Sequence, residues 1–390
     1  MAVRVAQAPA RADATHIGAF LRHLDFLLLA AVGALVAYGL VVLSAVTRDD
    51  VRGDPDYYVA RQGLYVVIGA IALAVVTAVS PNVYRRYRTA LYVSAISLTA
   101  IVFVVGSAIR GSKRWIEFGF FRFQPSELGK VLLILFLAAF LADRAKRIGE
   151  SKTTLTAVGL GALPAFLVFL EPDFGTALVY IVVLVVCLFL AGTPWRHLSA
   201  LAATAVGGAI ALLWLLPSMG IEILRPYQVD RLTGFLNPDA DPSGSTYNIT
   251  QSILAVGSGG LDGRGVGGAT QTNLNYLPEH ATDFVFSSLA EQRGFIGAAI
   301  LLLLYALIVW RGVKIIALAP DLFSAMVAGG IVCALLLQIF VNVGMTIGIA
   351  PITGIPLPLV SYGGSSMITT MMMIGLLEAI HVRGRLAGRS

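Results

Sequence analysis

The sequence is poor in charged residues. Of its 390 residues, 13% are Asp, Glu, Lys or Arg and 57% are hydrophobic, whereas a soluble protein carries about 25% charged residues. So few charges cannot cover a water-exposed surface, and much of the surface of this chain must therefore face lipid. The net charge of +6 is spread over short segments between apolar runs and forms no basic stripe. We therefore expect no nucleic-acid partner.

The sequence also lacks the motifs of several protein classes. Its two cysteines, Cys187 and Cys333, lie in separate apolar runs, so neither a disulfide framework nor a zinc site can be read from them. It contains no G-x-x-x-x-G-K-[ST] motif, which excludes a nucleotide-driven pump of that type. A formal G-x-G-x-x-G occurs at 263–268, but it lacks the strand and helix of a dinucleotide site. The chain has no S-x-x-K motif of a penicillin-binding transpeptidase.

What is present is a series of long apolar runs. Each has about 17–25 residues, the length that crosses a bilayer core of about 30 Å. The predicted fold class is therefore an all-α integral membrane protein with about ten transmembrane helices. The runs lie at 25–46, 63–79, 90–106, 126–142, 155–170, 175–191, 198–216, 285–310, 323–348 and 363–381.

The segments outside these runs divide the chain. We expect a disordered cytoplasmic tail at 1–24, a polytopic membrane domain over 25–381 and a second cytoplasmic tail at 382–390. A long external loop, 217–284, separates the seventh and eighth helices and has a helix-like stretch near 247–256. Most Lys and Arg residues outside this loop lie in the segments that would be cytoplasmic if both termini are inside. The positive-inside rule thus predicts a multi-pass protein of the cytoplasmic membrane with both termini cytoplasmic.

Ionisable residues at membrane depth are costly and mark candidate functional sites. Glu127 and Lys130 open the fourth apolar run and, three residues apart, share a helix face. They form either a structural ion pair or an anion-binding lysine oriented by its neighbour, and the two readings are compatible. Glu171 and Asp173 lie in the turn between the fifth and sixth runs. That turn is either solvated or presents carboxylates to a polar cavity.

Two external segments border the later helices. Asp283 stands just before the eighth apolar run, where it is either a helix cap or a general base held beside a lipid-borne substrate. The uncharged segment 349–366 contains three prolines and cannot be a regular helix. Non-helical backbone at this depth is tolerated where it is buried in protein or lines a cavity, so we expect this segment to line a groove. In the segment 107–125, aromatic and cationic residues alternate, as at a lipid headgroup interface.

These segments together resemble the SEDS family (shape, elongation, division and sporulation) over nearly the whole chain, from 25 to about 380. The stretch 345–358 resembles the RodA-like, elongation branch of that family more than its division branch. The sequence departs from the family at Glu171, where Gln is common, and at Ala281, in a variable position. The motifs that carry the resemblance are GSKRW at 111–115, FQPSE at 123–127, EPDFGT at 171–176, LPEHATDF at 277–284 and PLVSYGGSS at 358–366.

The resemblance implies a peptidoglycan glycosyltransferase at the outer face of the cytoplasmic membrane. Its substrate would be lipid II, an undecaprenyl-diphosphate-linked disaccharide-pentapeptide, added to a growing glycan strand during cell elongation. The resemblance implies that Asp283 is the catalytic carboxylate. It also implies a set of substrate-binding residues: Lys130, Glu127, Arg114, Trp115, Arg122, Asp173, His280 and Ser361.

The implied reaction converts an α-linked diphosphate into a β-1,4 link and is an inversion. Such a displacement needs a base on the acceptor hydroxyl and stabilisation of the leaving group. Asp283 is the candidate base, and Lys130, Arg114 and Arg122 are candidates to neutralise the diphosphate. No organic cofactor is implied. A divalent cation could supply part of the positive charge, and the sequence leaves that choice open.

Two other functions remain open at this point, a lipid-linked precursor transporter (flippase) and a non-catalytic scaffold. The family resemblance also implies a partner, a class B penicillin-binding protein that crosslinks the strands, alongside contact with membrane lipids. Its helix could dock on small residues of the eighth and ninth helices. The competing interpretation is that these residues pack within the bundle. They are Gly294, Gly297, Ala298, Ala299, Ser324, Ala325, Ala328, Gly329 and Gly330.

Overall fold

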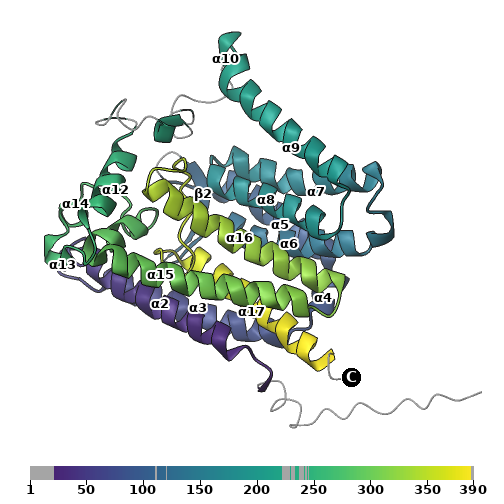
Figure 1. Ribbon diagram of the computed structural model, residues 1–390, viewed down its shortest axis with the longest axis horizontal. Helices are drawn as coiled ribbons and strands as arrows, with labels where there is room; N and C mark the ends of the chain where they lie inside the picture. The colour runs from purple at the N-terminus through teal and green to yellow at the C-terminus, as the bar shows by residue number, and fades with distance from the viewer. Residues whose placement is uncertain are drawn as a thin grey trace, which may run out of the picture.

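The apolar runs fold into long helices that lie side by side in the computed structural model of the chain (Figure 1). The structure describes residues 22–109, 112–119, 121–221, 229, 233–236, 241, 244 and 246–387. Within these residues nine helices are long and apolar enough to cross a membrane, and a tenth, α8, is apolar and slightly shorter. The predicted fold class, a helical membrane protein with about ten spans, is confirmed.

All ten predicted runs correspond to helices. They are α2 (Phe26–Val46), α3 (Tyr57–Ala78), α5 (Arg88–Val105), α6 (Pro125–Ala142), α7 (Ser151–Leu170), α8 (Phe174–Leu190), α9 (Trp195–Ile210), α15 (Val285–Leu318), α16 (Leu322–Thr346) and α17 (Gly364–Ala387). Helix α9 continues through a π-helical turn, η2 (Ala211–Leu215), into α10 (Leu216–Ser218). Helix α17 runs past 381, so the residues expected to begin a C-terminal tail are still helical. Most of the predicted N-terminal tail, residues 1–21, lies outside the described residues.

The helices differ greatly in how much protein surrounds them. Helices α6, α16 and α17 are largely buried, whereas no residue of α9 is buried. In Figure 1, α9 and α10 extend away from the rest of the bundle at one edge. Helix α17 packs mainly on α3, α5 on α6, and α15 on both α2 and α16. The buried helices therefore form a core around which α3, α5 and α9 present apolar side chains outward.

Both ends of the described chain lie at one face of the bundle. The backbone N–H of Asp25, the N-cap of α2, donates to Glu378 of α17 at 3.0 Å. The Asp25 carboxylate also accepts from the Arg311 guanidinium of α15 at 2.7 Å. An N-cap carboxylate satisfies the free backbone N–H groups of a first helical turn, and Asp25 does so for Leu28. The start of α2 and the end of α17 are thus held together.

Helix α15 bends sharply at Gly294, whose φ of 65° is not helical. A Cβ at this position would lie 2.3 Å from the backbone nitrogen of Gly263. The backbone N–H of Phe295 donates to the carbonyl of Gly260 at 2.8 Å instead of to its own helix. The glycine-rich run of the long loop therefore packs against the bend, which no residue with a side chain would allow.

The rest of the described loop is partly helical. It forms α12 (Tyr247–Ser258), α13 (Gly265–Gly268) and α14 (Thr270–Asn273), together with a short 3₁₀ turn, η3 (Gly234–Leu236). The helix predicted near 247–256 is confirmed. Glu291 of α15, which is fully buried, accepts hydrogen bonds from the backbone N–H groups of Gln271 and Thr272. A buried carboxylate thus fastens the end of the loop to the membrane helices.

The segment before α6 forms a small antiparallel sheet that the all-helical prediction missed. Its strands are β1 (Ser107–Ile109), β2 (Ser112–Phe118) and β3 (Phe121–Phe123), in the order β1-β2-β3. The alternation of aromatic and cationic residues, which is typical of a headgroup interface, also matches the two-residue period of a strand. Tyr65 of α3 contacts Phe121 edge-on, with ring centroids 5.7 Å apart, so the sheet rests on the membrane helices.

The small residues of α15 and α16 mostly face the interior of the bundle. Gly329 and Gly330 of α16 pack against Leu190 and Ile134, and a Cβ at Gly329 would lie 2.1 Å from a methyl carbon of Leu190. The hydroxyl of Tyr38 donates to the carbonyl of Gly297 at 3.1 Å. Of the two interpretations of these residues, packing within the bundle is the one observed. The lipid-facing docking surface built on them was wrong, because close helix packing inside the protein uses the same small side chains.

Candidate functional site

Four helices, α6, α8, α15 and α17, begin at the same face of the bundle. This face lies at the end of α6 that is opposite Ala142. Gln124, the residue before α6, connects them through two hydrogen bonds. Its side-chain amide donates to the carboxylate of Asp173, the N-cap of α8, at 2.7 Å. Its backbone N–H donates to the hydroxyl of Ser365, in the first turn of α17, at 2.9 Å. Helix N-termini carry partial positive charge, so this face is suited to an anion.

Glu127 and Lys130 form a buried ion pair in the first turns of α6. The ammonium Nζ lies 3.0 Å from each carboxylate oxygen, and the two side chains are 1–2% exposed. Beside them, the hydroxyl of Tyr180 donates to the carbonyl of Ser126 at 2.8 Å. Gly129 lies against this hydroxyl, where a Cβ would be 2.2 Å away. Of the two open readings, the ion pair is the one observed, and Lys130 is too buried to meet a substrate directly in this conformation.

Asp173 and Glu171 occupy the turn between α7 and α8 and are both buried. Asp173 caps α8 through the Thr176 N–H at 3.1 Å and lies 4.0 Å from an Arg114 guanidinium nitrogen. Glu171 differs, because neither of its carboxylate oxygens has a hydrogen-bond partner among the described residues. Burial and the Asp173 charge, opposed by Arg114, raise the pKa of Glu171 to about 8. The turn is therefore a buried acidic cluster and not a solvated one.

Asp283 lies in the turn that leads into α15 and is half-buried. The N-cap of α15 is Phe284, so the alternative that Asp283 is the helix cap is not observed. Its backbone carbonyl accepts from the side-chain amide of Asn342, on α16, at 2.9 Å. The same amide donates to the carbonyl of Ile355 at 2.8 Å. Asn342 thereby holds the turn carrying Asp283 against the proline-rich segment.

The proline-rich segment between α16 and α17 separates Asp283 from the acidic cluster. It is non-helical up to 363, as predicted, whereas the last three residues of the predicted segment, 364–366, already belong to α17. On one side, Gly175 at the start of α8 lies against it, since a Cβ there would be 2.8 Å from the carbonyl oxygen of Thr353. On the other side, Gly354 has a φ of 72°, and a Cβ on it would be 3.5 Å from a carboxylate oxygen of Asp283. The segment therefore borders both groups of acidic residues.

Two other predicted site residues are held by protein groups. The Ser361 hydroxyl donates to the carbonyl of Thr282 at 2.5 Å and accepts from the Leu357 N–H at 2.8 Å. The His280 ring meets Asp50, in the connection between α2 and α3, at 3.0 Å. Both contacts fasten the backbone around Asp283. In this structure Ser361 and His280 therefore shape the site, and their predicted contact with substrate remains a prediction.

The remaining predicted residues lie on the small sheet. Trp115 and Arg114 are half-buried in β2, and Arg114 points its charge toward Asp173. Arg122 of β3 pairs across the strands with Glu117, with 3.2 Å between guanidinium nitrogen and carboxylate oxygen, and both are exposed. Arg114 is thus close to the acidic cluster, whereas Arg122 is engaged at the surface of the sheet.

Sequence reasoning missed Gln124, Asn342 and Gln62 as supports of this site. Gln62 of α3 is buried, donates to the Ser361 carbonyl at 3.1 Å and accepts from the Gly363 N–H at 3.2 Å. The available signal was an amide side chain inside or beside an apolar run, where a polar group must find a partner. That rule indicates that a partner exists, but it does not identify it.

A divalent cation remains a prediction. In the part of the chain that the structure describes, no group of three His, Cys, Asp or Glu residues is placed to hold a metal ion. Mg²⁺ often uses only one or two carboxylates and completes its shell with water and substrate phosphates. The half-buried carboxylate of Asp283 fits that kind of site, in which the cation would arrive with a diphosphate.

The chain is similar to known proteins over most of its length. The family model for FtsW, RodA and SpoVE, described as "Cell cycle protein", matches residues 23–386. The peptidoglycan glycosyltransferase MrdB of Escherichia coli (strain K12) is 37% identical over 368 residues, which cover 94% of this chain and 96% of that protein. The stage V sporulation protein E of Bacillus subtilis (strain 168) is 38% identical over 355 residues, covering 90% and 93%.

Solved structures resemble it as well. A chain from a peptidoglycan synthase complex, described as coordinating polymerization and crosslinking, has a TM-score of 0.78 and 31% identity and covers 93% of this chain and 98% of its own. The rod shape determining protein RodA of Thermus thermophilus has a TM-score of 0.67 and 30% identity, with coverage of 92% and 96%. The similarity in sequence and the similarity in structure therefore cover the same region of the chain.

Proposed function

This chain belongs to the FtsW, RodA and SpoVE family, and we infer from that membership that it is a peptidoglycan glycosyltransferase. It is embedded in a membrane through its apolar helices. We propose that it polymerises lipid II into glycan strands and that it acts in cell elongation, because its sequence resembles RodA. The site at the N-termini of α6, α8, α15 and α17 is the proposed place of this reaction.

The observation that carries the proposal is the position of Asp283. Its carboxylate is half-buried beside Gly354, while Asp173 and Arg114 lie beyond the same non-helical segment. A general base must be able to reach the proton it removes and must be held in place. Asp283 meets both needs, since it is partly accessible and its turn is fastened by Asn342 and Ser361.

The proposed mechanism is a single inverting displacement. Asp283 removes the proton from the 4-hydroxyl of the acceptor sugar as that oxygen attacks the anomeric carbon of the donor. The bond from this carbon to the lipid diphosphate breaks, and its electron pair leaves with the diphosphate. Helix N-termini and the Arg114 guanidinium supply positive potential for the developing charge. Lys130 acts on the site through its charge and its pairing with Glu127, not through contact.

The orientation of the chain is part of the proposal. Lipid II carries its sugars on the outer side of the cytoplasmic membrane, so the face with Asp283 would be external and both termini cytoplasmic. The hydrogen bond between Asp25 and Glu378 keeps the two described chain ends at one face, the opposite end of the bundle from Gln124. The cation-rich turns at that end agree with the positive-inside rule.

A class B penicillin-binding protein is the proposed partner. A groove of about 370 Å³ opens between α15 and α16, lined by Leu302, Tyr305, Ala306, Val309, Trp310, Leu336 and Ile339. Its lining is almost wholly apolar and faces outward, so a single membrane-spanning helix can pack there. The groove lies on the two helices for which the sequence predicts docking of the partner. The residues that line it are not the small residues expected from the sequence.

A transporter of lipid-linked precursors is the competing function. Purified protein with lipid II in detergent micelles distinguishes the two, because transport needs a sealed membrane and polymerisation does not. We expect glycan chains longer than the disaccharide unit. Lipid II recovered unchanged from the folded protein, with and without the partner, would contradict the proposed function.

A further inference from the structure

The turn that follows α6 holds a basic pocket at the membrane boundary farthest from Asp283. Its volume is about 720 Å³, within the range of about 300–1,000 Å³ that accommodates small ligands. Five charged residues line it together with two alanines: Arg85 of α4 (Pro81–Arg86), Asp143, the C-cap of α6, and Arg144, Lys146 and Arg147 around the 3₁₀ turn η1 (Ala145–Arg147). None of the proposed glycosyltransferase chemistry uses this pocket.

The charges of the pocket do not balance. Asp143, its only acid, is shared by Arg85 at 2.6 Å and by Arg88 at the start of α5. Arg147 has only a long contact with Glu150, at 4.0 Å between largely exposed groups. Arg144 and Lys146 have no ion pair among the described residues. Several cations therefore remain for an external anion.

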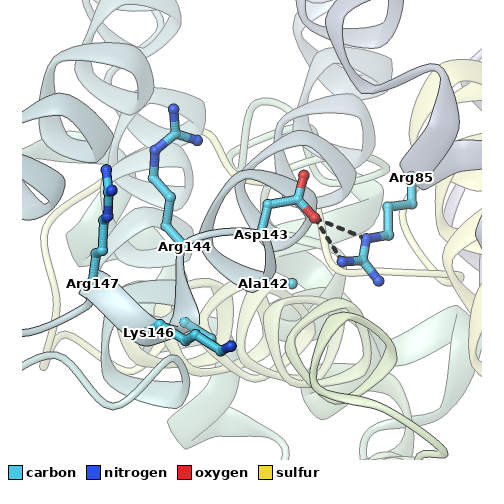
Figure 2. Close-up of a pocket in the computed structure, with 7 residues that line it drawn as sticks. Arg85, Ala142, Asp143, Arg144, Lys146 and Arg147 are labelled. Carbon is cyan, nitrogen blue, oxygen red and sulfur yellow. Dashed lines mark hydrogen bonds and ion pairs between the residues drawn. The ribbon is translucent and has the colours of Figure 1, made fainter.

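Figure 2 shows the arrangement of these side chains. Asp143 turns toward Arg85, and dashed lines mark their contact, whereas Arg144 and Arg147 extend in a common direction on the other side. The Arg144 guanidinium lies over the ring of Phe140, with 3.9 Å between its central carbon and the ring centroid. Stacking on an aromatic ring orients a guanidinium and leaves its N–H edge free for a phosphate. The pocket thus presents one guanidinium that is oriented by stacking, together with the cations of Lys146 and Arg147.

The surroundings of the pocket favour a lipid over a soluble anion. The pocket lies where α6 ends and α5 begins, which is the boundary of two membrane-spanning helices. On α4 and just after it, Val83 is 43% exposed and Tyr87 is 55% exposed. Tyrosine at such a boundary is typical of residues that contact headgroups and upper acyl chains. The pocket therefore lies at the depth of the lipid headgroups, next to a segment of the chain that contacts lipid.

We propose that this pocket binds the phosphate of an anionic phospholipid in the leaflet opposite the glycosyltransferase site. Basic pockets between membrane helices are suited to acidic headgroups, and arginine binds phosphate through paired N–H groups. A zwitterionic headgroup carries its own cation, which would meet Arg144 and Arg147 unfavourably. The pocket is therefore expected to select lipids with a net negative headgroup.

The test compares lipids on the full-length protein by native mass spectrometry from detergent. Phosphatidylglycerol and phosphatidylcholine are titrated onto the wild type, onto the triple variant Arg144→Ala, Lys146→Ala, Arg147→Ala, and onto a control. The control, Arg196→Ala, Lys314→Ala, Arg385→Ala, removes the same charge from exposed residues at the same face but outside the pocket. We expect the wild type and control to prefer phosphatidylglycerol. The preference of the pocket variant for phosphatidylglycerol should be about 100-fold weaker than that of the wild type, since each of the three cations contributes about a factor of five to the binding of an anionic lipid.

A second arm separates a lipid from a soluble anion. Thermal unfolding in detergent is followed with inorganic phosphate, pyrophosphate or phosphatidylglycerol added. Stabilisation of the wild type by phosphatidylglycerol alone supports the proposal, and equal stabilisation by the soluble anions overturns it. An equal lipid preference in the pocket variant and the control also overturns it. The unfolding temperature without added anion establishes that both triple variants are folded.

Discussion

The ammonium of Lys130 lies 3.0 Å from both carboxylate oxygens of Glu127, and neither side chain is more than 2% exposed. Removing one partner leaves the other charge buried and unpaired, which costs about 3–5 kcal/mol. We expect Glu127→Ala and Lys130→Ala each to lower the unfolding temperature strongly. The double exchange Glu127→Lys, Lys130→Glu should retain much more stability, because it keeps the pair.

An exposed ion pair provides the control for this experiment. Glu117 pairs with Arg122 on the sheet, and both are exposed, so Glu117→Ala should cost about 1 kcal/mol or less. The measurement is thermal unfolding in detergent, followed by tryptophan fluorescence. If Glu127→Ala unfolds no earlier than Glu117→Ala, the buried pair does not stabilise the fold.

Glu171 should make stability depend on pH. Its pKa is raised from 4.5 to about 8 by burial and by Asp173, so the folded protein prefers this carboxyl protonated. A raised folded-state pKa gives stability that is fully present below pH 4.5 and is lost as the pH rises through about 8. Glu171→Gln keeps the shape of the neutral acid and removes this loss.

We therefore expect the unfolding temperature of the wild type to fall relative to Glu171→Gln as the pH rises from about 5 to about 9. Glu150→Gln, which removes an exposed carboxylate, is the matched control and should follow the wild type. Parallel curves for the wild type and Glu171→Gln over this range would show that Glu171 is ionised in the folded protein throughout.

Ser361 is expected to position Asp283. Its hydroxyl joins the part-buried Thr282 carbonyl to the buried Leu357 N–H, and Ser361→Ala leaves both groups without this partner, at a cost of about 1–3 kcal/mol. The turn before α15 should shift, and small misplacements of a catalytic group cost up to about 100-fold in rate. Steady-state polymerisation should show a lower kcat with KM little changed. Ser44→Ala, which removes an exposed hydroxyl on α2, should be neutral; equal kcat values for the two variants would refute the positioning role.

The spans were predictable because each is a long apolar run, and this signal does not depend on how the helices pack. Contacts between distant segments were not predictable in the same way. The bond from His280 to Asp50 joins residues 230 positions apart, and no local pattern reports it. Small residues such as Gly329 look the same whether they contact a neighbouring helix or a partner.

Only part of the candidate site was predictable, because the sequence shows local patterns and does not show contacts between distant segments. Glu127 and Lys130 were expected to pair because three-residue spacing on a helix is a local rule. The β-strands were missed because their alternation was interpreted as an interface pattern. The bend at Gly294 was missed because it depends on Gly263, far away in the chain. The substrate itself came from family resemblance, since spacing and composition carry no such information.

The groove between α15 and α16 should control association with the partner. Ala306 lines it and is exposed, so Ala306→Phe would fill part of the groove without disturbing the core. We expect at least a tenfold loss of affinity for a class B penicillin-binding protein in detergent, or about 1.4 kcal/mol. Polymerisation in the absence of the partner should be unchanged.

The matched control is Ala205→Phe on α9, an exposed position far from the groove. It should bind the partner as the wild type does. Unchanged co-purification of Ala306→Phe, with the variant folded, would place the partner on another surface.

Replacing the carboxylate of Asp283 by an amide tests whether this residue is the general base of the glycosyltransferase. Asp283→Asn keeps the size of the side chain and removes its basicity, while the backbone contact with Asn342 is retained. Purified wild type and variant are given lipid II in detergent, and chain formation is followed by gel electrophoresis. We expect the variant to unfold at the temperature of the wild type and to polymerise about 10²–10⁴-fold more slowly. Chain synthesis by folded Asp283→Asn at a rate near that of the wild type would show that Asp283 is not the general base.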